Sequence, residues 1–377
     1  MSKKKDRHVV IIGAGIVGAA IALALTDRGA MVTVMDEAGP HAGATGNSFA
    51  WITNQAFFRA KDPIPEDCAR AYFNLHRFSL GAWRELESRL GAELGVRWGG
   101  SLHWGSGSEA VKLEAELSRR QAWGSPSYRI NRDQLISLLP VEVVDEFEFG
   151  FHAPDEGTVN PYSATAKLLD AAIQAGAVLD APRKATGFES RASGGVVVMT
   201  ETGPVEADHV IIATGRQTPD LAALVGINVP LVETVGHLVH LEPVELFLDT
   251  MVHGPSVHVI QRHDGRVILG RHFTGATVSD GEMLDVDALV SDAVQLFPRL
   301  KGAKVEKVTT GRRILPLDGL PIIGRSASIP AVRAVATNAG ISLGPVLAQL
   351  ITTEILDGVD VELLKAYRAE RFEQPAT

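Results

Sequence analysis

The chain has 377 residues, of which 45% are hydrophobic and 21% charged, a composition typical of a folded protein of about two domains. Its formal net charge of −9 argues against a nucleic-acid partner, because a phosphate backbone is bound by an excess of Lys and Arg. The single cysteine, Cys68, excludes an internal disulfide framework and a multi-cysteine metal site. We predict no metal site, and a reducing, cytoplasmic location fits this cysteine usage.

An uncharged stretch, residues 9–26, follows Lys3, Lys4 and Lys5 and superficially resembles a signal peptide or a short membrane span. The stretch contains three glycines at fixed offsets, and its length is at the low end for crossing a bilayer. We therefore predict no transmembrane segment, and interpret the lysines as a solvated tail.

The same stretch begins a strand–loop–helix–strand unit. Residues 8–12 are β-branched and apolar, as expected for a strand buried on both faces of a parallel sheet. They lead into Gly13-Ala14-Gly15-Ile16-Val17-Gly18, and residues 19–25 predict a helix. A second strand, residues 31–35, ends at Asp36. This order is typical of a dinucleotide-binding site.

Each glycine of this unit has a physical role. Gly13 permits the tight turn, Gly15 lets the backbone approach a pyrophosphate, and Gly18 lets the helix pack on the strand. The N–H groups at the helix start face the anion. Asp36 can accept hydrogen bonds from ribose hydroxyls, and Glu37 competes for that role. The predicted nucleotide contacts here are Gly13, Gly15, Ile16, Val17, Gly18, Asp36 and Glu37.

Two further segments are expected at the nucleotide. Residues 39–48 form a glycine-rich polar loop that suits a second pass along a phosphate or a flavin ring, although an ordinary surface loop is an alternative. Residues 206–215 predict a buried strand that ends in Gly and reaches the same edge. The predicted contacts are Thr45, Asn47, Ser48, Ala213, Thr214 and Gly215.

The remaining elements follow from periodicity and turn residues. Residues 229–273 alternate in polarity and carry the hairpin signal Asp264-Gly265, which predicts a separate sheet. Asn160 and Pro161 are a suitable N-cap and first residue for a helix. Other helices are predicted over residues 68–90, 110–120 and 132–139, and from residue 340 onward.

The C-terminal part carries Gly311-Arg312-Arg313, then Asp318-Gly319-Leu320-Pro321-Ile322-Ile323-Gly324, then Gly340-Ile341-Ser342-Leu343-Gly344-Pro345. With these motifs, the chain resembles the D-amino-acid-oxidase-like FAD oxidoreductases over nearly its whole length, especially the glycine oxidase and sarcosine oxidase branch. The resemblance also rests on residues 13–18 with Asp36, on residues 157–162 and on residues 212–215.

The resemblance implies an α/β (α+β) fold, namely a Rossmann-like FAD-binding domain of the glutathione-reductase type with an inserted antiparallel β-sheet substrate domain. It assigns residues 1–85, 145–215 and 308–377 to the FAD-binding domain. Residues 86–144 and 216–307 then form the substrate-binding domain.

The resemblance also implies roles for residues of the second half. Arg313 is expected to grip a substrate carboxylate, with Arg312 as its competitor and an internal ion pair as the alternative for either. His258 stands where the family often has a substrate-facing tyrosine, and His272 is a second candidate; an ordinary strand histidine is an equal alternative for both. The start of the last helix is expected at the flavin N1–C2=O edge. Its predicted contacts are Gly340, Ile341, Ser342 and Leu343.

We predict an FAD-dependent oxidoreductase that oxidises glycine, sarcosine, a D-amino acid or an imino acid by hydride transfer from the α-carbon to flavin N5. FAD is expected to be noncovalent, since Ser48 stands where a linking His could be. The alternatives are an FAD-dependent 2-hydroxy-acid or glycerol-phosphate dehydrogenase, an NAD-dependent dehydrogenase, and a non-catalytic flavin-binding subunit. The expected partner is a small carboxylate-bearing molecule, and a homo-oligomer is compatible with the sequence.

Overall fold

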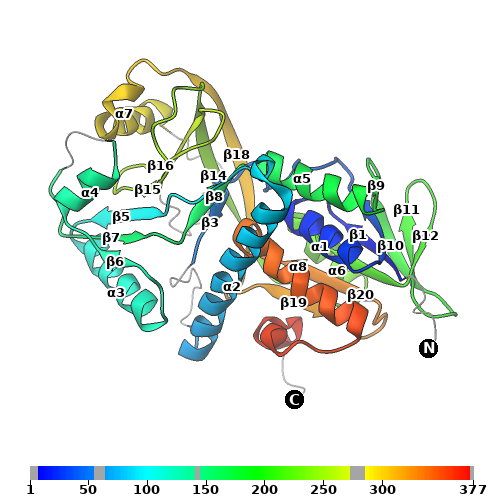
Figure 1. The fold of residues 1–377 in the computed structure, drawn as a ribbon. Helices are drawn as coiled ribbons and strands as arrows, with labels where there is room; N and C mark the ends of the chain where they lie inside the picture. The colour runs from blue at the N-terminus through cyan, green and yellow to red at the C-terminus, as the bar shows by residue number, and fades with distance from the viewer. Residues whose placement is uncertain (1–6, 55–63, 141–144, 272–284, 374–377) are drawn as a thin grey trace.

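The computed structural model describes residues 7–54, 64–140, 145–271 and 285–373. Figure 1 shows two lobes, each built around its own large sheet, with the long strands β14 and β18 running between them. One lobe holds both ends of the described chain. Among the described residues, no helix combines the length and the apolar character needed to span a membrane.

The first lobe contains a six-stranded sheet in the order β19-β20-β13-β1-β2-β9. Five strands run parallel, and β19 is antiparallel to β20. The central strands are apolar because helices or other strands cover both faces. The strands are β1 (His8–Ile12), β2 (Met31–Met35), β9 (Val178–Asp180), β13 (His209–Ile212), β19 (Ile322–Arg325) and β20 (Val332–Ala336).

Helices α1 (Ile16–Asp27), α5 (Pro161–Gln174) and α8 (Gly340–Asp357) pack together in this lobe. The predicted cap of α5 is confirmed, because the Asn160 side chain accepts hydrogen bonds from the backbone N–H groups of Tyr162 and Ser163. Helix α2 (Glu66–Leu90) packs against α8 between the two lobes.

The second lobe contains an eight-stranded sheet in the order β18-β14-β17-β16-β15-β5-β7-β6. The expectation of an antiparallel sheet is wrong at one pairing, since β15 and β5 run parallel. These two strands come from separate stretches of the chain, so no hairpin fixes their relative direction. The strands are β5 (Ser101–Gly105), β6 (Tyr128–Arg129), β7 (Phe149–Ala153), β14 (Leu231–Leu241), β15 (Met251–His253), β16 (His258–Gln261), β17 (Val267–Gly270) and β18 (Val305–Pro316).

The predicted Asp264-Gly265 hairpin is confirmed between β16 and β17. Gly265 has φ +84°, a conformation that glycine adopts at no steric cost. Helices α3 (Ser108–Ala122), α4 (Arg132–Leu138) and α7 (Val286–Leu296) belong to this lobe (Figure 1).

The smaller elements complete both lobes. A three-stranded sheet of β10 (Ala185–Ser190), β11 (Val196–Thr200) and β12 (Val205–Ala207) extends from the first lobe. A second small sheet joins β3 (Trp51–Ile52), β8 (Gly157–Val159) and β4 (Val96–Arg97).

Sheet membership differs from the division of the chain predicted from the sequence. Strands β7 and β18 belong to the eight-stranded sheet, although residues 145–215 and 308–377 are assigned above to the FAD-binding domain. Helix α6 (Thr218–Ala223) packs on β13 and β20 of the first lobe, although residue 216 begins the predicted substrate-binding segment. Strands β14 and β18 each run without interruption between the two lobes (Figure 1).

Candidate active site

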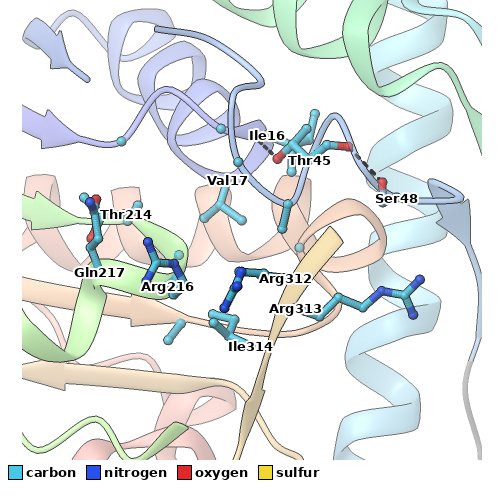
Figure 2. Close-up of a pocket in the computed structure, with 18 of the residues that line it drawn as sticks. Ile16, Val17, Thr45, Ser48, Thr214, Arg216, Gln217, Arg312, Arg313 and Ile314 are labelled. Carbon is cyan, nitrogen blue, oxygen red and sulfur yellow. Dashed lines mark hydrogen bonds between the residues drawn. The ribbon is translucent and has the colours of Figure 1, made fainter. Parts of the chain in front are cut away.

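A cavity of about 800 Å³ lies where the two lobes meet. It is lined by the glycine loop after β1, the loop after β2, the end of β13, the start of α8, and strands β14 and β18. Its volume is within the range of about 300–1,000 Å³ found for small-molecule and cofactor sites. Figure 2 shows part of its lining, with Ile16, Val17 and Thr45 on one side and Arg312 and Arg313 on the other.

The glycine loop at one end of the cavity is enclosed by backbone. Gly13 has φ +113°, and a Cβ there would lie 2.4 Å from the carbonyl oxygen of Ala213 at the end of β13. A Cβ at Gly18 would lie 1.9 Å from the carbonyl oxygen of Gly13, so α1 packs directly on the turn. Gly15 lines the cavity, and a Cβ there would lie 3.2 Å from the Thr45 hydroxyl. These contacts fit a phosphate-binding turn.

Two acidic residues line the same end. Asp36 Oδ2 accepts a hydrogen bond from the backbone N–H of Ala14 at 2.8 Å, and its Oδ1 accepts from the N–H groups of Ala38 and Gly39. Glu37 accepts a hydrogen bond from the Gln217 side chain. The Asp36 carboxylate is therefore held in place beside the glycine turn, while Glu37 contacts the segment after β13.

The predicted glycine-rich loop is tied to the start of α1. Thr45 Oγ1 accepts a hydrogen bond from the Ile16 N–H at 3.3 Å, and the Ser48 hydroxyl donates to the Thr45 carbonyl at 2.9 Å (Figure 2). The Asn47 side chain donates to the Gly43 carbonyl at 3.1 Å. Thr45, Asn47 and Ser48 all line the cavity, as do Ala213, Thr214 and Gly215.

The start of α8 forms another part of the wall. Gly340, Ile341 and Ser342 line the cavity, and the first N–H groups of a helix have no acceptor within the helix. Leu343 differs from the other three predicted contacts. Its N–H donates to the Ala339 carbonyl at 2.8 Å, and its side chain is buried in the hydrophobic core rather than in the cavity lining.

The two candidate arginines leave β18 in opposite directions (Figure 2). Both line the cavity. Arg312 forms an ion pair with Glu233 at 2.6 Å, and its side chain is 57% exposed. Burial lowers the pKa of the Arg313 guanidinium from its ordinary value, although an arginine remains protonated. Arg313 is thus the more enclosed cation of the two.

Of the two histidine candidates, only His258 lies within the described residues. His258 on β16 is 3% exposed, and its ring centroid lies 5.7 Å from that of Trp51 and 6.4 Å from that of Phe49. Phe49 and Trp51 line the cavity, whereas His258 is not among the lining residues. His272 lies outside the residues that the structure describes.

Several lining residues have no signal in the sequence. Thr234 on β14 is directly opposite Arg313 on β18, and only the pairing of these distant strands brings it to the cavity. Phe49 and Trp51 stack at 4.8 Å and form an apolar wall. Among the described residues, no group of three or more His, Cys, Asp or Glu side chains is placed to hold a metal ion.

The glycine turn, the fixed carboxylate after β2 and the adjoining cavity define a dinucleotide-binding protein of the doubly wound α/β class. The sequence profile of the DAO family of FAD-dependent oxidoreductases matches residues 8–354. The chain therefore belongs to this family, and the predicted family and cofactor are confirmed.

Similar proteins agree with this assignment. The bifunctional protein ThiO/ThiG of Trichormus variabilis is 26% identical over 387 residues, which cover 98% of this chain but 56% of that relative's length. Glycine oxidase of Pseudomonas putida is 26% identical over 368 residues, covering 94% of this chain and 96% of the relative. The crystal structure of glycine oxidase from Geobacillus kaustophilus superimposes with a TM-score of 0.83 at 22% identity, covering 98% and 100% of the two chains. This likeness confirms the predicted fold class.

Proposed function

We propose that this protein oxidises a small amino acid or secondary amine whose carboxylate is bound by Arg313. The observation that carries the proposal is that Arg313 lines the same cavity as the glycine turn and the start of α8. One relative that matches over nearly its full length is a glycine oxidase, which supports a small amino acid as the substrate. Bound FAD supplies the two-electron acceptor.

Arg313 orients the substrate in this proposal. Its planar guanidinium makes two parallel charge-assisted hydrogen bonds to a carboxylate, which fix both the position and the direction of the α-carbon. Arg313 is partly buried, and burial lowers its pKa, so its attraction for an anion is stronger than at a fully exposed site. Arg312 is 57% exposed and more accessible to water than Arg313, which makes it the weaker candidate.

The N-terminus of α8 is proposed to stabilise negative charge in the cavity. The N–H groups at Gly340, Ile341 and Ser342 carry the positive end of the helix dipole toward the cavity. They favour negative charge that develops there when electrons leave the substrate. Ser342 is held rigidly for this purpose, because its hydroxyl donates to the Trp51 carbonyl and accepts from the Thr53 N–H.

An amine substrate fits the lining better than an alcohol. The substrate reacts as the neutral amine, after its ammonium proton has passed to water. The α C–H bond then breaks as its hydrogen leaves with the electron pair to the bound two-electron acceptor, and the nitrogen lone pair forms the C=N bond without a protein base. An alcohol must also lose its O–H proton to a base. Among the described lining residues, the one histidine is His41, which belongs to the nucleotide loop, and His258 lies behind Trp51.

Anaerobic bleaching of the FAD-loaded protein tests the proposal. We expect glycine, sarcosine, D-alanine or D-proline to bleach the flavin absorbance at about 450 nm, whereas lactate, glycerol phosphate and NADH do not. Bleaching by lactate or glycerol phosphate alone would establish the alcohol alternative. A colourless protein that rejects added FAD but reduces NAD would contradict the proposal altogether.

Arg313→Ala tests the role of the arginine. We expect kcat/KM for the best amine to fall by about 100-fold or more, because a buried charge-assisted contact to the substrate is lost. FAD content is expected to stay unchanged, since the atoms nearest to Gly13, Gly15 and Gly18 belong to other residues. Full activity in this variant would remove Arg313 from the substrate site.

A further inference from the structure

Strand β14 presents a glycine to the Arg313 side chain. A Cβ at Gly236 would lie 3.0 Å from Cζ, 3.0 Å from Nη2 and 3.2 Å from Nε of Arg313. These are the three nearest heavy atoms, so an added side chain would meet the guanidinium first. Even an added methyl group would require the guanidinium to shift by a few tenths of an ångström, and a larger side chain would require more.

The glycine opposite Gly236 has a related role. Gly311 on β18 is its register partner, and a Cβ at Gly311 would lie 2.7 Å from the Asn47 carbonyl oxygen. The two glycines together form a gap in the surface of the sheet. One side of the gap receives the Arg313 guanidinium, and the other receives the loop that carries the predicted nucleotide contacts Thr45 and Asn47.

Thr234 lies on the same strand, two residues before Gly236 and directly opposite Arg313. Its side chain lines the cavity and is 1% exposed, and its Oγ1 has no hydrogen-bond partner among the described residues. A buried hydroxyl without a partner costs about 1–3 kcal/mol. A ligand in the cavity can remove that cost by accepting a hydrogen bond from the hydroxyl.

We infer that β14 supplies the second half of the carboxylate site: Gly236 is a positioning residue that makes room for the Arg313 guanidinium, and Thr234 donates a hydrogen bond to the carboxylate held there. The inference rests on the proposed function, in which Arg313 binds that carboxylate. A carboxylate offers about four lone-pair sites on its two oxygens, and a forked guanidinium uses two. One of the others accepts from Thr234.

Acetate binding to the FAD-loaded protein tests this, with affinity measured by calorimetry and by perturbation of the flavin spectrum. We expect Thr234→Val to weaken acetate binding about 10-fold, the loss of one hydrogen bond to a charged group. Thr234→Ser, which keeps the hydroxyl, is expected to restore most of the affinity. The matched control is Thr352→Val, because the Thr352 hydroxyl is also buried and without a described partner but lies outside the cavity lining.

Gly236→Ala is expected to weaken acetate binding by a similar factor while FAD content and the thermal midpoint stay near the original values. Its matched control is Gly187→Ala on β10, where the nearest atom to an added Cβ is 3.7 Å away. In the Arg313→Ala background, Gly236→Ala should have no further effect, because the displaced group is absent. An equal loss in that background, or loss of FAD from the single variant, would show that Gly236 acts on the fold rather than through Arg313.

The outcomes separate the two levels of the proposal. If Arg313→Ala weakens acetate binding but Thr234→Val and Gly236→Ala match their controls, the inference about β14 is wrong and the arginine clamp stands. If acetate fails to bind the unaltered protein, both are wrong.

Discussion

Two pairs of glycines, one pair near each end of the cavity, face different kinds of atoms. At the nucleotide end, Gly13 and Gly18 face backbone carbonyl oxygens. At the other end, Gly236 faces the Arg313 guanidinium and Gly270 faces the ring of Phe49. Backbone cannot move without moving whole elements, whereas a side chain can change its rotamer. The surroundings of Gly13 and Gly18 at the nucleotide end are therefore rigid, whereas those of Gly236 and Gly270 at the substrate end can adjust to a substitution.

This difference suggests how related proteins can share a cofactor and differ in substrate. A substitution at the rigid nucleotide end disturbs both the sheet and the binding of the cofactor. A change on β14, β18 or the Phe49–Trp51 wall moves side chains that line the cavity and leaves the glycine turn intact.

The largest effect is expected for Gly18→Ala. The added methyl group would lie 1.9 Å from the Gly13 carbonyl oxygen, so α1 must separate from the turn. We expect destabilisation above about 4 kcal/mol and protein purified without FAD. Absorbance spectra and chemical denaturation, with Gly187→Ala as control, measure both. A variant that binds FAD normally would show that the nucleotide end is not rigid.

A buried imidazole on α2 lies next to the cavity-lining residue Thr53 and makes stability depend on pH. Burial lowers the pKa of His76 to about 4, while its Nδ1 lies 2.7 Å from the Thr53 carbonyl. The unfolded chain binds this proton from about pH 6.5 downward and the folded chain only near pH 4, so stability falls as pH drops through that window, by about 3 kcal/mol.

Denaturation of the unaltered protein and of His76→Gln at pH 7 and pH 4.5 checks this. The variant should lose less stability on acidification, and the part that remains comes in part from His209 and His240, whose pKa values burial also lowers to about 4. Parallel pH profiles for the two proteins would mean that His76 does not titrate differently on folding.

A moderate effect is expected for Gly270→Ala at the adjustable end. The methyl group would lie 2.5 Å from two ring atoms of Phe49, which can rotate. We expect a loss of about 1–3 kcal/mol with FAD retained, and partial recovery when Phe49→Leu is added. Loss of FAD in the single variant would show that the substrate end is no more adjustable than the nucleotide end.

The smallest effect is expected for Arg312→Ala. Its ion pair with Glu233 is exposed, and such pairs contribute less than about 1 kcal/mol. Acetate affinity should stay within twofold of the original. A loss of acetate affinity as large as that of Arg313→Ala would show that Arg312, not Arg313 alone, binds the carboxylate.

Local patterns in the sequence identify the family, the cofactor and most of the described elements. The glycine turn with Asp36, the cap at Asn160 and the hairpin at Gly265 depend on residues close together in the chain, where φ preferences and short-range hydrogen bonds decide the conformation. The same reasoning misses the parallel β15–β5 pairing and the membership of β7 in the second sheet, because neither is specified by a turn.

The tertiary structure alone decided what surrounds the substrate end. The sequence names Arg313 by its motif, but only the register of β14 against β18 places Thr234 and Gly236 beside it. His258 carries the right chemistry for the cavity and yet lies behind Trp51. Strand register and the layering of aromatic side chains arise from packing between distant segments, and no local pattern in the chain encodes them.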